Sequence, residues 1–399
     1  MAQMPDSPLT CLDLWCKAGS FYEKEGEEGL AHFLEHMVFK GSSKLKEGEF
    51  DKQIEALGGS SNAATGFDDV HYYVLVPPEN VITAIDLLTN LVLNPALDKT
   101  AYSLERQVVL EEIAQHKDQP EEQVFQCLLK NCWGSHAYGR SILGLEKTLL
   151  ASSPNEMSEF HKRQYQTSNM AISIAGVIPE NILEILEKSD LTRINYHSIL
   201  NPLENKISNL IFKTGRKEIE IPRLESVRLT IAWPLSPAKD QMMIMGADIV
   251  TSLLAEGRNS IFIKRLREEL QIVESIYMDI TALEQGGLYI LEVCCLEENI
   301  NAVESEIQLI LRNYLCNEVT SKELMRAKKL VTNSLCFSLE LPSQIAAIAG
   351  SQVLWNRHQQ LLEPLKYIDS WNANNIKDLI FKQLQLENSF TLISRPVNK

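Results

Sequence analysis

The chain has 399 residues, of which 45% are apolar and 23% are charged, and this mix is typical of a soluble globular protein rather than a disordered or fibrous one. At roughly 150 residues per domain, the length favours two domains. Acidic residues outnumber basic ones by 53 to 38, and the net charge of −15, without a basic stripe, argues against a nucleic-acid partner.

The sequence also argues against a membrane protein. No apolar run approaches the roughly 18 residues that a membrane helix needs. The first residues lack the cationic and apolar segments of a signal peptide. We therefore expect no membrane span and a cytoplasmic location.

Apolar periodicity predicts strands and helices in alternation along the first half. The clearest helix ends at Gly41, and its apolar residues have the spacing of one helix face. They are Leu30, Phe33, Leu34, Met37 and Val38. The other elements predicted in this half are a strand at 9–17, a helix at 48–57, a turn at 58–61, a strand at 71–76 and helices at about 79–92 and 98–117.

The second half of the chain repeats features of the first half, which predicts a duplication. Glu79 and Glu298 stand before similar helices, at an offset of 298 − 79 = 219. Further along, Arg106 and Arg326 match at an offset of 326 − 106 = 220. Because the two offsets are nearly equal and fall on equivalent elements, we infer two halves of like fold.

This duplication fixes the predicted fold class and domain organisation. We predict an α+β protein of two homologous α/β domains, each a largely antiparallel sheet with helices packed on one side. The domains are predicted at residues 1–200 and 201–399, and the connector within 190–215, where the periodicity is broken.

The polar face of the first helix carries His32, Glu35 and His36, in the order H-x-x-E-H. Positions 32 and 36 are one turn apart on one face, so two imidazoles can bind one ion. A zinc site with an open position for water uses three protein ligands and a nearby base, and Glu35 is placed to be that base. The alternative is a solvated polar face whose histidines bind nothing.

The helix predicted at 98–117 offers the third ligand. Glu105 and Glu112 are seven residues apart and share a face, whereas Glu111 is rotated away by about 100°. We choose Glu112 as the ligand, and Glu105 as a carboxylate that orients a metal-bound imidazole or the ligand helix. The alternative for this pair is an acidic helix face in solvent.

The H-x-x-E-H motif, followed 112 − 36 = 76 residues later by Glu112, resembles the pitrilysin and insulin-degrading-enzyme superfamily of zinc peptidases, and most of all its mitochondrial-processing-peptidase-like branch. Three further segments carry the resemblance: 58–63, 138–144 and 323–328. It covers nearly the whole chain. The resemblance implies that His32, His36 and Glu112 bind one zinc ion per chain and that Glu35 is the general base.

The resemblance also implies how a peptide substrate is bound. The family presents an edge strand beside the metal, to which the peptide adds as an extra strand. Asn62 and Ala63 match the positions that contact the peptide backbone there. We add Tyr72, on the strand that follows, as a third predicted substrate contact. The alternative for Asn62 is a turn residue that caps the bend at 58–59.

Departures from the family pattern bear on the number of sites and on the partner. The positions 220 beyond the motif residues cannot build a second metal site: they hold Ser252, Ala255 and Glu256. Homodimeric bacterial relatives usually carry Arg and Tyr where this chain has Ile261 and Glu274, which cannot hold a substrate in the same way. We therefore expect a heterodimer with a related subunit that lacks the motif, rather than a homodimer. A shifted alignment is the competing explanation, since Arg258 and Tyr277 lie three residues away.

The start of the chain departs from the pattern as well. Relatives usually begin with one further strand, and only eight residues precede the strand at Leu9. Either that strand is absent or the true start lies upstream.

Together these observations predict a zinc endopeptidase, of processing or peptide-degrading type, that cleaves extended peptides enclosed between subunits. One alternative is a non-catalytic peptide-binding or structural subunit of a larger complex. Another is a metal-dependent hydrolase of a non-peptide substrate, which would need a compact pocket instead of a strand edge.

Overall fold

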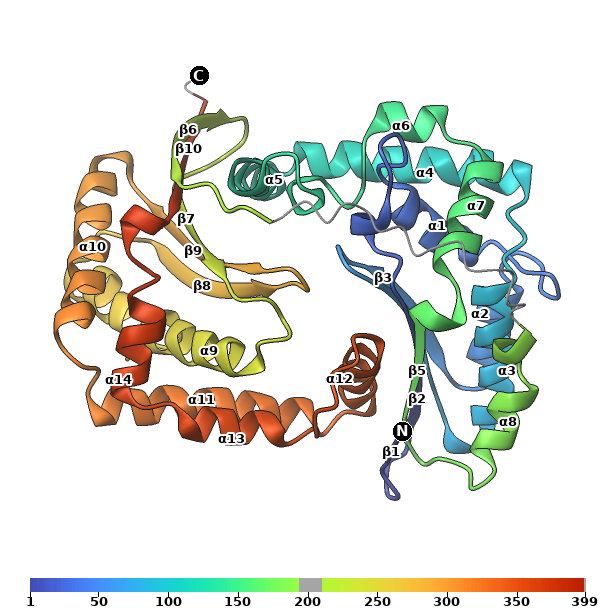
Figure 1. Cartoon of the computed structure of the whole chain (residues 1–399). Helices are drawn as coiled ribbons and strands as arrows, with labels where there is room; N and C mark the ends of the chain where they lie inside the picture. The colour runs from blue at the N-terminus through green and yellow to red at the C-terminus, as the bar shows by residue number, and fades with distance from the viewer. Residues whose placement is uncertain (194–209, 398–399) are drawn as a thin grey trace. The chain divides into compact units, whose positions relative to one another are not determined.

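The computed structural model describes residues 1–193 and 210–397, and it divides the chain into two compact units (Figure 1). The first unit comprises Met1–Gln115, Ser141–Ser208 and Phe337–Leu361, so far as these are described. The second comprises His116–Arg140, Asn209–Cys336 and Leu362–Lys399, with the same restriction. None of the described helices combines the length and the hydropathy that crossing a bilayer requires.

The first unit is built on a five-stranded sheet with the order β1-β5-β2-β4-β3. Its strands are β1 (Ala2–Gln3), β2 (Thr10–Cys16), β3 (Ser60–Thr65), β4 (Val70–Val76) and β5 (Met170–Gly176). The short β1 runs parallel to β5, and the other pairs are antiparallel. Strand β3 forms the edge of the sheet opposite β1.

The second unit repeats this topology. Its sheet has the order β6-β10-β7-β9-β8, with β6 parallel to β10 and the other pairs antiparallel. The strands are β6 (Gly215–Ile221), β7 (Val227–Leu235), β8 (Ser275–Ala282), β9 (Gly287–Cys295) and β10 (Phe390–Pro396). The predicted α+β fold with two largely antiparallel sheets is therefore confirmed.

Helices cover one face of each sheet and close an apolar core against it (Figure 1). The first unit contains α1 (Leu30–Val38), α2 (Glu49–Ala56), α3 (Val81–Leu93), α4 (Lys99–Asp118), α6 (Glu146–Ala151), α7 (Pro154–Gln164) and α8 (Ile182–Lys188). The second contains α9 (Gln241–Ala255), α10 (Ile300–Cys316), α11 (Ser321–Ser338), α13 (Glu363–Ser370) and the short α14 (Ala373–Asn375).

Two equivalent helices are exchanged between the halves of the sequence. Helix α5 (Pro120–Trp133) lies against β6, β7 and β10, and helix α12 (Pro342–Leu354) lies against β2 and β5. Their first residues are 342 − 120 = 222 positions apart, close to the offset of the repeat. Each compact unit therefore contains one helix from the other half of the sequence, and the linear division at residue 200 stays a prediction.

Helix α12 covers the face of the first sheet that is turned away from the helical core. Successive strand residues face opposite sides, and Leu12 belongs to the main core whereas Cys11 packs with Ala346 of α12. The Ser173 hydroxyl donates to the Ala346 carbonyl at 2.6 Å. The predicted arrangement, with helices on one side, is thus extended by one helix on the other side.

Two elements near the start of the chain differ from the expectation. A first strand is present, because Ala2 and Gln3 pair with β5. The predicted turn at 58–61 is shorter, since Ser60 already belongs to β3. The apolar pattern did not indicate this strand, because its polar and small residues lack the apolar alternation of a strand and pairing with β4 holds it in place instead. Only the family resemblance placed Asn62 and Ala63 on an edge strand.

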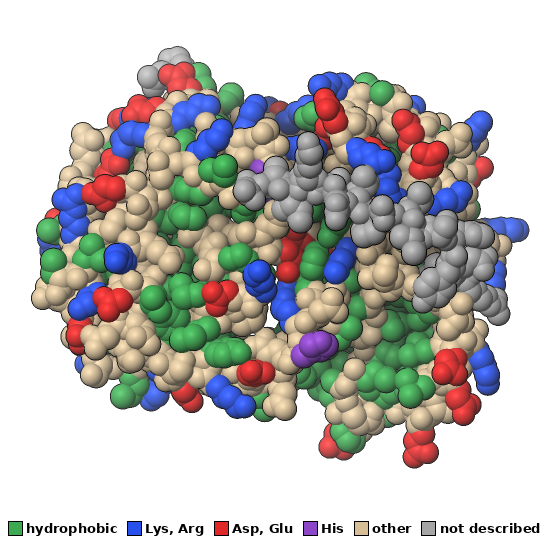
Figure 2. Space-filling view, in the orientation of Figure 1, with side chains coloured by type: hydrophobic (Ala, Val, Ile, Leu, Met, Phe, Trp, Pro, Cys, Tyr) green, Lys and Arg blue, Asp and Glu red, His purple; other side chains and the backbone are tan. Residues whose placement is uncertain are grey.

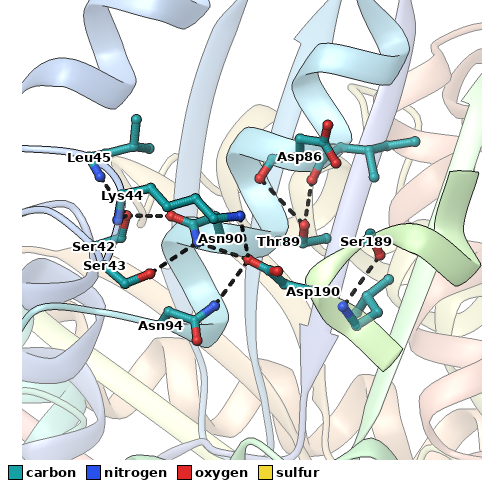
Figure 3. A network of polar contacts seen from close by, with 12 residues as sticks. Ser42, Ser43, Lys44, Leu45, Asp86, Thr89, Asn90, Asn94, Ser189 and Asp190 are labelled. Atoms are coloured by element: carbon teal, nitrogen blue, oxygen red, sulfur yellow. Dashed lines mark hydrogen bonds and ion pairs between the residues drawn. The ribbon is translucent and has the colours of Figure 1, made fainter. Parts of the chain in front are cut away.

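A buried carboxylate anchors the segment that follows α8 (Figure 3). Asp190 Oδ2 accepts hydrogen bonds from Asn90 at 2.8 Å and Asn94 at 3.2 Å, and Lys44 Nζ lies 3.3 Å away. The Asn90 side chain also accepts from the Ser42 hydroxyl at 2.6 Å. This network fixes the chain to α3 shortly before the undescribed residues 194–209, within which most of the predicted connector falls.

Candidate metal centre

Helix α1 is held in one orientation by its start and by its apolar face. Gly29, with φ of 94°, precedes the helix, and the Glu23 carboxylate accepts the backbone N–H groups of Gly29 and Ala31 at 3.0 and 2.9 Å. The predicted apolar face is buried in the core, at 0–1% exposure: Leu30, Phe33, Leu34, Met37 and Val38. The polar face, with His32, Glu35 and His36, is thereby directed away from the core.

Helix α4 brings Glu112 to the two histidines. Glu112 Oε2 lies 3.6 Å from His32 Nε2 and 3.5 Å from His36 Nε2, and the three possible ligand atoms all lie within 4.8 Å of one another. Ligand atoms of a tetrahedral zinc, bonded at about 2.0–2.2 Å, lie roughly 3.3–3.6 Å apart. The donor set therefore fits zinc, and the two distances to Glu112 match this spacing.

The same site remains open to solvent. The side chains of His32, His36 and Glu112 are 10%, 23% and 31% exposed. A catalytic zinc site keeps one position for water beside three protein ligands, whereas a structural site is closed by four. The arrangement is therefore of the open kind.

Glu105 is not one of the candidate ligands, but it contacts His36, which is. Its Oε1 is 2.9 Å from His36 Nδ1, and its Oε2 is 2.7 Å from Lys40 Nζ. Burial alone would raise the pKa of Glu105, but the hydrogen bonds from Lys40 and His36 outweigh burial and hold this pKa below its ordinary value. An ionised carboxylate on Nδ1 fixes the ring so that Nε2 faces the metal position.

Lys40 was missed by the sequence reasoning. It stands four residues after His36, so the i, i+4 spacing on the same helix face could have suggested it. In the structure its ammonium group lies between Glu105 and Glu47, at 2.7 and 3.6 Å.

Glu35 lies beside the candidate ligands but points toward β3. Its Oε2 accepts a hydrogen bond from the Thr65 hydroxyl. Burial raises the pKa of the Glu35 carboxyl above its ordinary value, although the Thr65 hydrogen bond and the neighbouring His36 act in the opposite direction. A raised pKa suits a group that takes up a proton and later releases it near neutral pH.

The outer edge of β3 offers backbone groups to a ligand. Just past the strand, the Gly66 N–H donates to the Asp69 carbonyl at 2.8 Å. Bonded and non-bonded pairs alternate in an antiparallel ladder, so Asn62 bonds to β4 while the N–H and C=O of Ala63 point to the open edge. In agreement, the Ala63 N–H donates to the Asn62 side-chain oxygen at 2.9 Å.

Two predicted substrate contacts therefore lie where an added strand would bind, but the third does not. Asn62 is exposed and bonds its own strand, not the bend at 58–59. Tyr72 is fully buried, its hydroxyl lies 2.8 Å from the Tyr165 hydroxyl, and β4 is paired on both sides. Neither its side chain nor its backbone is available to a peptide, so the role predicted for Tyr72 is corrected to packing beneath the edge strand.

The second unit holds other side chains at the corresponding place. On α9 the Ser252 hydroxyl donates to the Glu256 carboxylate. Ile261 packs against the core of this unit, and Glu274 accepts from the Ser226 hydroxyl at 2.9 Å. Tyr277 is 59% exposed and donates to Asp279 at 2.9 Å.

Two family models match consecutive parts of the chain. Residues 2–146 match the model described as insulinase, peptidase family M16. Residues 152–331 match the model described as peptidase M16 inactive domain. The first match contains the four residues of the H-x-x-E-H and Glu112 constellation, and the second contains the positions where that constellation is absent.

Curated relatives of similar length include zinc proteases. The chain is 24% identical over 402 residues to an uncharacterised zinc protease, YmxG, of Bacillus subtilis (strain 168). This alignment covers 98% of this chain and 94% of the relative. It is 26% identical over 397 residues to the mitochondrial-processing peptidase subunit beta of Homo sapiens, which covers 95% of this chain and 79% of that one.

Solved structures share the fold over the whole chain. A protease from Helicobacter pylori superposes with a TM-score of 0.88 at 21% identity, covering 99% of this chain and 95% of that one. A structure described as peptidase M16 inactive domain, from Pseudomonas fluorescens, gives a TM-score of 0.89 at 19% identity, with 100% and 95% covered. These similarities establish the likeness of the fold.

Proposed function

The chain belongs to peptidase family M16, and from this premise we propose that it is a zinc-dependent endopeptidase that hydrolyses extended peptides. The observation that carries the proposal is the convergence of His32, His36 and Glu112 from two helices, with Glu35 beside them. One zinc ion per chain fits this donor set. The names of its relatives support the same chemistry, since several of them are described as zinc proteases.

Each side chain of the centre has a separate task in this proposal. His32, His36 and Glu112 would hold the ion, and Glu105 would keep the His36 ring oriented through Nδ1. When bound, zinc supplies Lewis-acid activation of a water molecule and of the scissile carbonyl. Glu35 accepts the proton of the attacking water and then donates it to the departing amine.

The substrate proposed here is a peptide bound as an additional strand on β3. The outward C=O of Ala63, together with its N–H once the Asn62 side chain releases it, would pair with the main-chain groups of such a peptide, and this selects an extended conformation more than particular side chains. A compact ester or amide would gain nothing from the strand edge. On the face drawn in Figure 2, Lys and Arg side chains are interspersed with Asp and Glu, which gives no support to a nucleic-acid partner.

We further propose that the active form contains a second, related subunit without the H-x-x-E-H motif. The apolar Ile261 and the acidic Glu274 stand where homodimeric bacterial relatives usually carry Arg and Tyr, and neither can donate hydrogen bonds to a substrate carbonyl as those groups can. The chain purified alone should then show little peptidase activity. Full activity of the chain without a partner would contradict the heterodimer and favour a homodimer or a monomer.

The function is tested on the protein isolated with its partners from its source cells. Unstructured peptides and small esters are offered in parallel, with and without a zinc chelator, and products are identified by mass spectrometry. We expect internal peptide cleavage that the chelator abolishes and that zinc restores, with no ester hydrolysis. Peptide binding without cleavage would instead support the non-catalytic subunit, and preferential ester cleavage would support a non-peptide hydrolase.

A further inference from the structure

Thr65 lies where the peptide-binding edge and the proposed general base meet. It is the last residue of β3, and it pairs with Val70 of β4. Its hydroxyl donates to Oε2 of Glu35, which lies on α1. Thr65 thus connects the strand that would carry the substrate with the carboxylate that would accept the proton.

The register of β3 explains why residue 65 reaches the base. Side chains alternate along a strand, so Ala63 and Thr65 face the same side, while Asn62 faces the other. Ala63 packs partly against the helical core, which shows that this side is the one covered by α1. By the alternation of the ladder, the backbone of Thr65, like that of Ala63, is directed to the open edge.

The chemistry of a threonine suits the positioning of a carboxylate. A hydroxyl can donate one hydrogen bond to an ionised carboxylate, so it occupies Oε2 and leaves Oε1 free to accept a proton. The β-branched side chain also has few χ1 rotamers, which keeps the hydroxyl directed at α1. Valine has the same shape without the donor, and serine has the donor without the second methyl group.

We propose that Thr65 is a positioning residue that orients Glu35 for proton transfer and sets its distance from a peptide bound on β3. This inference rests on the proposed function of Glu35 as general base. It goes beyond the ligand set and the base, because it assigns to the edge strand a role in the chemical step as well as in binding.

The kinetic test compares Thr65→Val and Thr65→Ser with the unchanged protein, purified with its partners. A lost hydrogen bond to a charged group corresponds to a fall in kcat of roughly 10- to 100-fold for Thr65→Val. We expect KM and zinc content to remain within about twofold, because the backbone edge and the ligands are untouched. Thr65→Ser should recover most of kcat. Thr281→Val, on the edge strand β8 of the second unit, is the matched control and should change nothing.

A crystal structure of each variant supplies a readout that does not depend on activity. In Thr65→Val the Glu35 carboxylate should leave the position it holds beside β3, and in Thr65→Ser it should keep that position. An unmoved carboxylate in the valine variant, or a loss confined to KM, would overturn the inference. Absence of peptide cleavage by the unchanged protein would count against the proposed function instead, and the carboxylate position would still decide the role of Thr65.

Discussion

The two compact units have the same strand order and different contacts between equivalent helices. In the first unit, α1 and α4 approach each other through His32, His36 and Glu112. In the second, α11 approaches the end of α9 through Arg326, which donates to the carbonyls of Ser252 at 3.0 Å and Glu256 at 2.9 Å. The fold therefore brings two helices together in both units, and the side chains decide whether they form a candidate metal site or a cap at a helix end.

This difference separates the contribution of the fold, which is the same in both units, from the contribution of a few side chains, which differ. A fold shared over two units does not imply a shared function, because chemistry depends on a few side chains. The first unit combines the candidate ligand set with the proposed base and a strand edge, while Arg326 in the second donates to carbonyls of the last turn of α9. The comparison predicts that changes in the first unit affect metal and turnover, and that matched changes in the second affect stability.

The largest effect is expected from Glu35→Gln, which removes the proposed base without changing the shape of the side chain. The fall in kcat should be roughly 10²- to 10⁴-fold. Zinc content and peptide affinity should stay unchanged, because Glu35 is not in the ligand group. Glu111→Gln, an exposed position on α4, is the matched control. Steady-state peptide cleavage and zinc analysis check this prediction, and unaltered turnover in Glu35→Gln would remove this residue from the mechanism.

A smaller effect is expected from Glu105→Gln, which keeps the volume but weakens the contacts to His36 and Lys40. Loss of such a supporting carboxylate typically lowers metal affinity or activity roughly 10- to 100-fold. Competition with a fluorescent zinc chelator measures the affinity. An affinity equal to that of the Glu111→Gln control would show that Glu105 serves only the packing of α4.

The edge strand is tested by two proline substitutions at neighbouring positions. Ala63→Pro removes an N–H that points outward, which an edge strand tolerates, so the fold should persist while KM rises roughly 5- to 10-fold. Asn62→Pro removes an N–H that bonds to β4 and should lower the free energy of unfolding by about 3 kcal/mol. Thermal unfolding and peptide kinetics separate the two outcomes. A normal KM in a well-folded Ala63→Pro variant would argue against peptide addition at β3.

The smallest effect concerns the second unit. Arg326→Met should lower the free energy of unfolding by roughly 1–3 kcal/mol, because the carbonyls at the end of α9 lose charged donors. Arg312→Met, at an exposed ion pair with Glu387, should cost less than about 1 kcal/mol. Denaturant unfolding and zinc analysis are the measurements. A loss of bound zinc in a folded Arg326→Met variant would contradict the separation of roles between the units.

Sequence reasoning could predict the parts of the site that lie on single helices. The spacing of His32 and His36, and of Glu105 and Glu112, follows from the helix period alone, and the structure places these side chains together. Which carboxylate faces the histidines, and which backs them, depends on how α1 and α4 pack. The shared face sets Glu111 apart from the other two, and the family resemblance separately implies Glu112 as the ligand.

The parts that could not be predicted depend on tertiary contacts between distant segments. Nothing in a single sequence indicates that Thr65 bonds Glu35, since 30 residues separate them. The Tyr72 side chain is buried because it faces the helical core of the first unit, and its backbone is occupied because β4 is paired on both sides. A strand pattern alone reveals neither contact. The exchange of α5 and α12 between the halves is invisible for the same reason, because both helices have ordinary apolar faces.

Native mass spectrometry of the chain isolated from its source cells tests the central claim most directly, because it reports bound metal and a second subunit in one spectrum. The unchanged protein should carry one zinc ion per chain, and His36→Ala and Glu112→Ala should carry none, while Ser252→Ala in the second unit should keep the ion. A metal-free spectrum of the unchanged protein in the presence of zinc, or zinc retained in both ligand variants, would contradict the account.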